Sequence, residues 1–139
     1  MFAKRLIPIL NVSDMQQSFD WFKKLGWEKS WDWGKPPTFA SIRSGECEIF
    51  LCLDGQGGRG RGKNRSTFGE SGGESADKGV WMSIWVDDVD EACQHCADNG
   101  IEILFKPADM SWGVREMHIR HPDGHVFRVS QDIESETED

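Results

Sequence analysis

The segment SWGVREMHIRHPDGHVFRVSQ, residues 111–131, decides how the rest of the chain is interpreted. Alternating residues lie on both sides of Pro122-Asp123-Gly124. This tripeptide favours a tight turn, because Pro presets φ, Asp can bond back to the backbone and Gly accepts a positive φ. The segment therefore predicts a β-hairpin closed by a bulged turn.

Pairing about this turn sets His118 opposite Arg128 and Ile119 opposite Phe127. One face of the predicted hairpin is apolar and belongs in the core: Met117, Ile119, Phe127 and Val129. The other face mixes charge with imidazole: Glu116, His118, Arg120, Val126, Arg128 and Ser130. That second face fits the wall of a binding cavity, and it fits a solvated sheet face equally well. His121 and His125 are expected to pair across the hairpin mouth, near solvent.

Composition narrows the class of protein. A chain of 139 residues suggests one domain, or two small modules that share a core. A net charge of −8 disfavours nucleic acid as a partner and would attract a cationic small molecule. Apolar runs too short for a bilayer and the absence of a signal-peptide pattern predict a cytoplasmic protein with no membrane partner and reduced cysteines. Seven Trp and eight Phe exceed the needs of a small core and favour stacking on flat ligands.

Two motifs suggest chemistry but lack the context for it. The pair Cys93 and Cys96 has the spacing of a redox or zinc motif, yet it lies in a helical pattern with no second pair at suitable spacing. The Gly-rich residues 54–79 lack the Lys-Ser/Thr pair and the following helix of a phosphate loop. We interpret this segment as a mobile linker or lid.

Helical and strand-like patterns occur twice along the chain. When the sequence is aligned with itself at an offset of 74 residues, Met15 aligns with Val89 and Gly26 aligns with Gly100. The first copy is expected to consist of a strand at 4–12, a helix at 14–25, a strand at 27–33 and a hairpin at 39–43 and 47–53. The second is expected to consist of a strand at 80–86, a helix at 88–99, a strand at 101–105, a loop at 107–111 and the hairpin described above. Internal repetition on this scale predicts the fold better than any single motif.

Within these elements we expect particular faces to be buried. The predicted buried face of the first helix consists of Met15, Phe19, Phe22 and Leu25. The predicted buried face of the second helix consists of Val89, Ala92, Cys93, Cys96 and Ala97. Strict alternation would place Trp27, Trp31 and Trp33 on one face of their strand. Pro8 confines the first strand to a sheet edge or a bulge.

The fold class predicted is therefore α+β. It consists of two βαβββ modules, residues 4–53 and 80–131, whose helices cover one face of a curved mixed sheet and leave the other face free around a cavity. The two modules form a single domain spanning 1–139. Residues 54–79 join the modules, and the acidic residues 132–139 form a frayed tail.

Three segments carry a resemblance to a known family: VSDMQQSFDWFKKLGW (12–27), VDDVDEACQHCADNGI (86–101) and HPDGHVFRV (121–129). Over roughly residues 4–131 the chain resembles the vicinal oxygen chelate superfamily, which includes glyoxalase I, extradiol dioxygenases and bleomycin-resistance proteins. The segment SWGVREM (111–117) is most similar to the bleomycin-resistance branch, in which a Trp-Gly-x-Arg-Glu segment is typical. The resemblance implies the fold above and a homodimer.

The resemblance also bears on a metal. Enzymes of the superfamily hold a divalent metal with His, Glu or Gln at four positions, which correspond here to Ile7, Phe50, Trp81 and Arg128. None of these side chains ligates a hard or borderline cation, and Arg128 would repel one. The prediction is no metal and no other cofactor. A site built from His118, His121 and His125 is disfavoured, because His118 and His121 face opposite ways.

Aromatic and charged side chains on the inferred cavity faces are the predicted ligand-binding residues: Phe50, Trp81, Trp85, Trp112, Glu116, His118 and Arg128. Aromatic rings would supply stacking, and carboxylates would hold a cationic group. No catalytic residue stands out. The function favoured is a metal-free binding protein of bleomycin-resistance type that sequesters an aromatic, cationic compound. The alternative is a metal-dependent lyase, isomerase or dioxygenase with atypical ligands.

Overall fold

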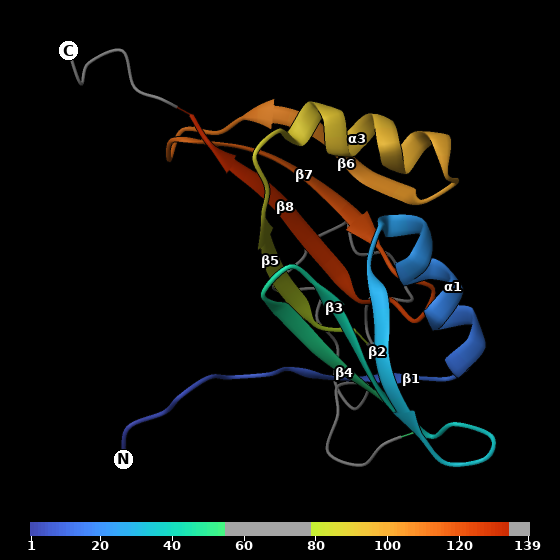
Figure 1. The fold of residues 1–139 in the computed structure, drawn as a ribbon. Coiled ribbons are helices and arrows are strands. Elements are labelled where there is room, and N and C mark those ends of the chain that lie inside the picture. The colour runs from blue at the N-terminus through green and yellow to red at the C-terminus, as the bar shows by residue number, and fades with distance from the viewer. Residues whose placement is uncertain (55–78, 134–139) are drawn as a thin grey trace. The chain divides into compact units, whose positions relative to one another are not determined.

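The computed structural model describes residues 1–54 and 79–133 (Figure 1). The chain divides into two compact units, Met1–Arg61 and Gly62–Asp139. The segment predicted to be a mobile linker or lid lies, apart from its ends, outside the described residues, as does most of the predicted acidic tail. No helix in the described ranges is long and apolar enough to cross a membrane.

The first unit holds one helix and a four-stranded mixed sheet. Its elements are β1 (Ile9–Val12), α1 (Met15–Leu25), β2 (Glu28–Trp33), β3 (Phe39–Ser44) and β4 (Cys47–Leu53). The strand order is β1-β4-β3-β2, with β1 parallel to β4 and the other neighbours antiparallel.

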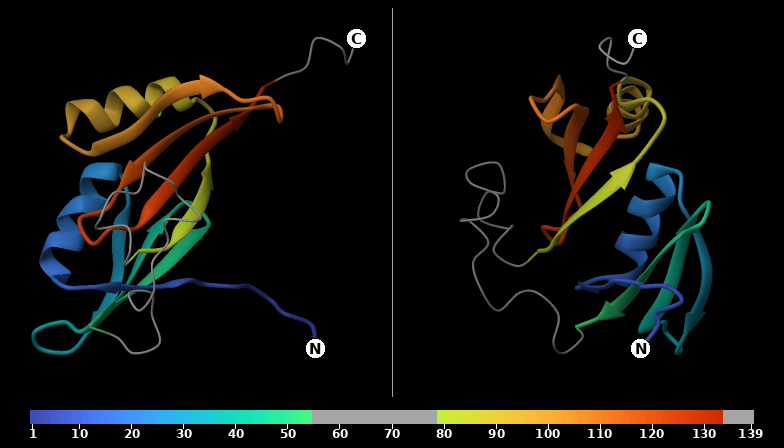
Figure 2. Two further views of the ribbon diagram at one scale, coloured as in Figure 1. Left: turned by 180° about the vertical axis from the view of Figure 1, so that it is seen from behind. Right: turned by 90° about the vertical axis from the view of Figure 1, so that its left-hand side faces the viewer.

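The second unit repeats this topology. Its elements are β5 (Trp81–Trp85), α3 (Val89–Asp98), β6 (Glu102–Asp109), β7 (Val114–Arg120) and β8 (Val126–Asp132). The order β5-β8-β7-β6, with β5 parallel to β8, matches the first unit strand for strand (Figure 2). The predicted α+β fold of two βαβββ modules is confirmed, and so is the hairpin register, with His118 opposite Arg128 and Ile119 opposite Phe127.

Capping explains where the helices begin and end. The side chains of Asp14 and Asp88 each accept a hydrogen bond from the backbone N–H three residues on, at 2.9 and 3.0 Å. This satisfies donors that a helix leaves unpaired in its first turn. Gly26 ends α1 with a φ of 98°, which a residue without a Cβ adopts at little cost.

The buried faces of the helices differ in part from the prediction. In α1 the buried residues are Met15, Ser18, Trp21 and Phe22, whereas Phe19 and Leu25 are half-buried. The Phe19 ring lies 5.2 Å from the Lys29 ammonium instead of in the core. In α3 only Val89 and Cys96 are buried, and the predicted core residue Ala97 is exposed.

Two strand boundaries were also predicted wrongly. The first strand begins at Ile9 instead of Lys4, because Pro8 has no N–H to extend the ladder, although its carbonyl accepts from the Phe50 N–H at 2.9 Å. Strand β6 continues to Asp109 through the region predicted as a loop. It tolerates Pro107 because it lies at the edge of its sheet.

Each sheet has one face toward its helix and one face away from it, which we call the helix-free face. In the first sheet the side toward α1 is apolar and almost fully buried: Ala40, Ile42, Ile49 and Leu51. In the second sheet the side toward α3 is equally apolar: Met117, Ile119, Phe127 and Val129. The residues between them along each strand therefore lie on the helix-free faces.

A bulge at matching places in the two modules moves an aromatic residue onto the helix-free face. In the first module Lys29 pairs with Ile42, but Trp31 pairs with Ser41, so the register shifts between them. Trp27 remains buried on the helix side, where its ring is 5.8 Å from Phe22. The prediction that Trp27, Trp31 and Trp33 share one face is wrong, because a bulge inverts the alternation beyond it.

The second module has the same irregularity. Ile103 pairs with Ile119 on the helix side, whereas Phe105 pairs with His118 on the helix-free face. A shift of 74 residues carries Lys29 onto Ile103 and Trp31 onto Phe105, so the two bulges occupy equivalent positions. Both bulges bring an aromatic side chain to the sheet face turned away from the helix of the same module.

Candidate functional site

A buried carboxylate lies at the centre of the helix-free face of the second sheet. Glu116 on β7 is 2% exposed and accepts hydrogen bonds from Arg128 Nη2 at 2.7 Å and from His118 Nε2 at 2.8 Å. Burial alone would raise the pKa of Glu116, but the hydrogen bonds from Arg128 and His118 outweigh it and the pKa is lowered. The carboxylate is therefore ionised, and its hydrogen bond raises the pKa of Arg128.

Aromatic rings flank the imidazole of His118. The centroid of Phe105 lies 5.0 Å from that of His118, and the centroid of Trp81 on β5 lies 5.8 Å away. The Nδ1 atom of His118 is buried and has no hydrogen-bond partner in the described part of the chain. The face therefore holds aromatic rings around one buried polar ring atom with unused bonding capacity.

The helix-free face of the first sheet has a related centre. Glu48 on β4 accepts a hydrogen bond from the Ser41 hydroxyl at 2.5 Å. Its other carboxylate oxygen lies 3.2 Å from Arg5 Nη1 and 3.4 Å from Arg43 Nη1. Each helix-free face thus holds a carboxylate that is already neutralised by arginine.

An aromatic cluster adjoins Glu48. The ring centroids of Trp31, Phe39 and Phe50 lie 5.3 to 5.9 Å apart. Next to this cluster is an open, mainly apolar hollow of about 590 Å³, lined by Trp31, Trp33, Thr38, Phe39, Cys52 and Leu53. The side chain of Trp33 is 70% exposed at this hollow. A large apolar ring that solvent can reach is a surface on which a flat ligand could stack.

The structure brings together four of the seven predicted ligand-binding residues: Trp81, Glu116, His118 and Arg128. Phe50 lies in the first module, within the aromatic cluster. Trp85 is further along β5 and Trp112 is in the turn before β7, and both are exposed, at 59% and 62%.

Four residues of the helix-free faces were missed by the sequence interpretation: Trp31, Trp33, Phe39 and Phe105. Strict alternation placed Trp31 on the same face as Trp27, whereas the bulge puts these two residues on opposite faces. The signal that could have found the two bulged residues is the 74-residue repeat, which aligns Trp31 with Phe105.

The described residues do not fit the metal that enzymes of the resembled superfamily use. Phe50 and Trp81 are hydrophobic at the positions of ligands, and Arg128 is bound to Glu116. Across residues 1–54 and 79–133 no group of three or more His, Cys, Asp and Glu is arranged to hold an ion. Burial raises the pKa of the Cys96 thiol to about 11, so this residue is a poor thiolate donor.

The histidine pair at the hairpin mouth is buried, which corrects the prediction that it lies near solvent. His121 and His125 are 0% and 1% exposed. Nδ1 of His121 accepts from the Asp123 N–H at 3.0 Å, and Nδ1 of His125 accepts from the Val80 N–H at 3.2 Å. Burial, reinforced by His125, lowers the pKa of His121 to about 3 despite the opposing charge of Asp123. These rings hold the hairpin closed against the start of β5.

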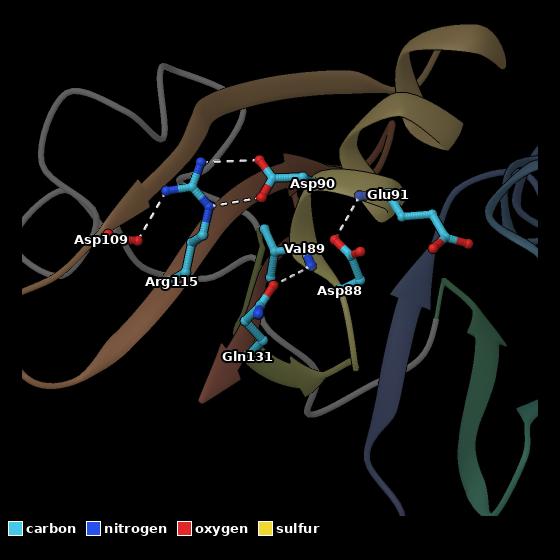
Figure 3. A network of polar contacts seen from close by, with 7 residues as sticks. All are labelled: Asp88, Val89, Asp90, Glu91, Asp109, Arg115 and Gln131. Carbon is cyan, nitrogen blue, oxygen red and sulfur yellow. Dashed lines mark hydrogen bonds and ion pairs between the residues drawn. The ribbon is translucent and has the colours of Figure 1, made fainter. Parts of the chain in front are cut away.

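A network of polar contacts positions α3 on the opposite side of the second sheet (Figure 3). Arg115 binds Asp90, in the first turn of α3, through Nε at 2.9 Å and Nη2 at 3.0 Å, and it binds Asp109 at 2.9 Å. The neighbouring Glu116 points to the helix-free face because successive strand residues alternate. The Arg-Glu pair of SWGVREM therefore serves two faces, Arg115 for the helix and Glu116 for the candidate site.

Comparisons with known proteins agree with this architecture. Residues 5–129 match the Glyoxalase/Bleomycin resistance protein/Dioxygenase superfamily. The match covers most of the chain, so this protein belongs to that superfamily. A comparison with curated protein sequences gives no significant match.

Solved structures share the fold at low sequence identity. The bleomycin resistance determinant encoded on transposon Tn5 aligns with a TM-score of 0.69 and 16% identity, covering 94% of this chain and 98% of the other. TioX from Micromonospora sp. ML1 aligns with a TM-score of 0.73 and 19% identity, covering 94% and 100%. A bleomycin-binding protein complexed with bleomycin aligns with a TM-score of 0.66 and 16% identity, covering 94% and 99%.

Proposed function

We propose that this protein binds and sequesters an aromatic small molecule on its helix-free faces, as a binding protein of bleomycin-resistance type. The observation that carries the proposal is the pair of equivalent bulges, which turn Trp31 and Phe105 away from the helices. A bulge costs ladder hydrogen bonds, and bulges are common where a side chain must be aimed at a site. Each module aims an aromatic ring in this way, so each helix-free face by itself fits the binding of an aromatic ligand.

Aromatic composition supports the same class of ligand. A planar molecule gains from stacking on Trp and Phe rings and from losing contact with water. Trp33 and Trp81 offer such rings, one in each module, beside the clusters described above. The bleomycin-binding neighbour supplies a precedent for small-molecule binding on this fold.

The charged side chains on the two helix-free faces determine which charged substituents of a ligand they can bind. The sequence predicted a cationic ligand held by carboxylates. Glu48 and Glu116 are both engaged by arginines, so neither is a free anion for a cation to meet. The support that remains for a cationic ligand is the overall charge of −8, which acts at long range on association more than on contacts.

Calorimetric titration with bleomycin, together with cationic, neutral and anionic flat aromatics of similar size, tests the proposal. At least one aromatic compound is expected to bind. Trp31→Ala should weaken binding at the helix-free face of the first module, and Trp81→Ala should weaken binding at that of the second, each roughly ten- to a hundredfold, the usual range for loss of one stacking partner.

Phe2→Ala is the matched control, because Phe2 is an aromatic residue that is 97% exposed and outside both faces. It should leave affinity unchanged. If no aromatic compound binds at millimolar concentration, the proposed function is wrong. If Phe2→Ala weakens binding as much as the two tryptophan variants do, the assignment of the faces is wrong.

A further inference from the structure

The bonding of Glu116 determines which nitrogen of His118 carries the proton. Oε1 of Glu116 accepts from Arg128 Nη2 at 2.7 Å, and Oε2 accepts from Arg128 Nε at 3.3 Å. Oε2 also lies 2.8 Å from His118 Nε2. An ionised carboxylate can only accept hydrogen bonds, so Nε2 must be the donor. In the neutral ring, Nδ1 is then a bare acceptor.

Within residues 1–54 and 79–133 this acceptor has no partner, which is unusual for a buried polar atom. Nδ1 of His118 is buried and makes no hydrogen bond to any described residue. Most buried polar atoms of side chains are bonded, and an unsatisfied one costs about 1–3 kcal/mol. Of the two rings on its flanks, Phe105 has no N–H or O–H to donate, and the indole N–H of Trp81 makes no hydrogen bond to Nδ1.

In the first module, the position equivalent to His118 is occupied by Ser41, which has a single side-chain oxygen. Ser41 lies opposite the bulged Trp31 as His118 lies opposite the bulged Phe105. Its hydroxyl donates to the buried carboxylate of Glu48, as His118 Nε2 donates to Glu116. A hydroxyl has one proton, and this bond uses it. An imidazole makes the same bond and still presents a second nitrogen.

We propose that His118 Nδ1 is the specificity-determining acceptor of the site, and that it selects aromatic ligands bearing an N–H or O–H donor at the ring edge. Phenols, lactams and heteroaromatic rings with an N–H belong to this class. The inference rests on the proposed function, since it assigns the polar anchor of the same helix-free face. A ligand without the donor would leave Nδ1 unpaired, and discrimination of this kind is strong in a buried site.

The test begins with the free protein. Nitrogen NMR of the imidazoles at pH 8, above the range in which imidazoles ordinarily gain a second proton, should show His118 protonated at Nε2 and bare at Nδ1. A His118 ring protonated at Nδ1 in the free protein would overturn the inference without reference to any ligand.

The second step compares matched ligands. 2-Naphthol and 2-methoxynaphthalene have the same ring system, and only the first can donate. Wild type should bind 2-naphthol at least about fivefold more tightly, from the cost of an unpaired buried acceptor. His118→Gln retains an amide donor for Glu116 but has no acceptor at the Nδ1 position, so it should bind both compounds with similar affinity. His95→Gln, an exposed histidine on α3, should keep the preference.

The outcomes separate the two proposals. If both compounds bind wild type equally and Trp81→Ala weakens both, the inference about His118 fails and the proposed function stands. If His118→Gln keeps the preference, another group or an ordered water meets the donor and the inference also fails. If neither compound binds, and the panel of aromatic compounds described above also fails to bind, the proposed function fails and the inference fails with it.

Discussion

Acid should destabilise this protein through the buried histidine at the hairpin mouth. His121 is fully buried, and its pKa is lowered from 6.5 to about 3. The unfolded chain therefore binds a proton between these two values that the folded chain does not bind. Stability is fully present above pH 6.5 and is lost as the pH falls from 6.5 toward 3.

The size of the effect follows from these two pKa values. Between pH 7 and pH 5, a group that titrates at 6.5 when unfolded and at about 3 when folded removes about 2 kcal/mol of unfolding free energy. That is a large share of the 5–15 kcal/mol typical of a folded domain. Urea denaturation at the two pH values measures it as a shift in midpoint at constant slope.

His121→Gln removes the titrating group and should lose much less stability than wild type over the same pH interval, even if it is less stable at both values. The control is His95→Gln, which alters an exposed histidine and should lose as much as wild type. Equal losses in wild type and His121→Gln would refute the reasoning. If the variant does not fold, the NMR chemical shifts of the His121 ring in wild type provide the test. These shifts should stay constant from pH 7 to pH 4, and a titration midpoint near pH 6.5 would contradict the prediction.

Three further predictions concern packing, the α3 network and assembly. Gly79→Ala should lower stability by about 1–3 kcal/mol in urea denaturation, because an added Cβ would lie 2.0 Å from the Gly124 carbonyl oxygen; unchanged stability would show that these backbones are not in contact. Arg115→Gln should speed amide exchange in the first turn of α3, because it removes the hydrogen bonds to Asp90. Added salt should reduce the difference in exchange rate between the variant and wild type. Equal exchange rates in the two proteins would contradict this prediction. The homodimer implied by the family resemblance should sediment at twice the 15.8 kDa chain mass at micromolar concentration, and a monomer would refute it.

Much of the fold could be predicted because local signals agree with one another. Pro122-Asp123-Gly124 sets the hairpin register, and that register brings His118 opposite Arg128. The caps at Asp14 and Asp88 begin two helices at equivalent points of the repeat. These signals act over a few residues, so they can be interpreted without knowing the tertiary structure.

The parts that could not be predicted depend on contacts between distant segments. The alternation of residues near Lys29 does not itself mark the bulge that turns Trp31 to the other face, because the register shift is defined by the pairing with β3. The burial of His121 and His125 depends in part on β5, whose Val80 N–H reaches His125 from more than forty residues away. A hairpin mouth is normally solvated, and the parallel pairing of β5 with β8 contributes to closing this one.

The most direct test of aromatic binding on the helix-free faces uses the tryptophans as separate reporters. Their indole N–H signals can be followed by nitrogen-proton correlation NMR while an aromatic compound that binds in the calorimetric titration is added. Trp31, Trp33 and Trp81 should shift, because they lie on the helix-free faces, whereas Trp21 and Trp27 are buried on the helix side and should not. Shifts at Trp21 and Trp27 with none at the other three would contradict the account.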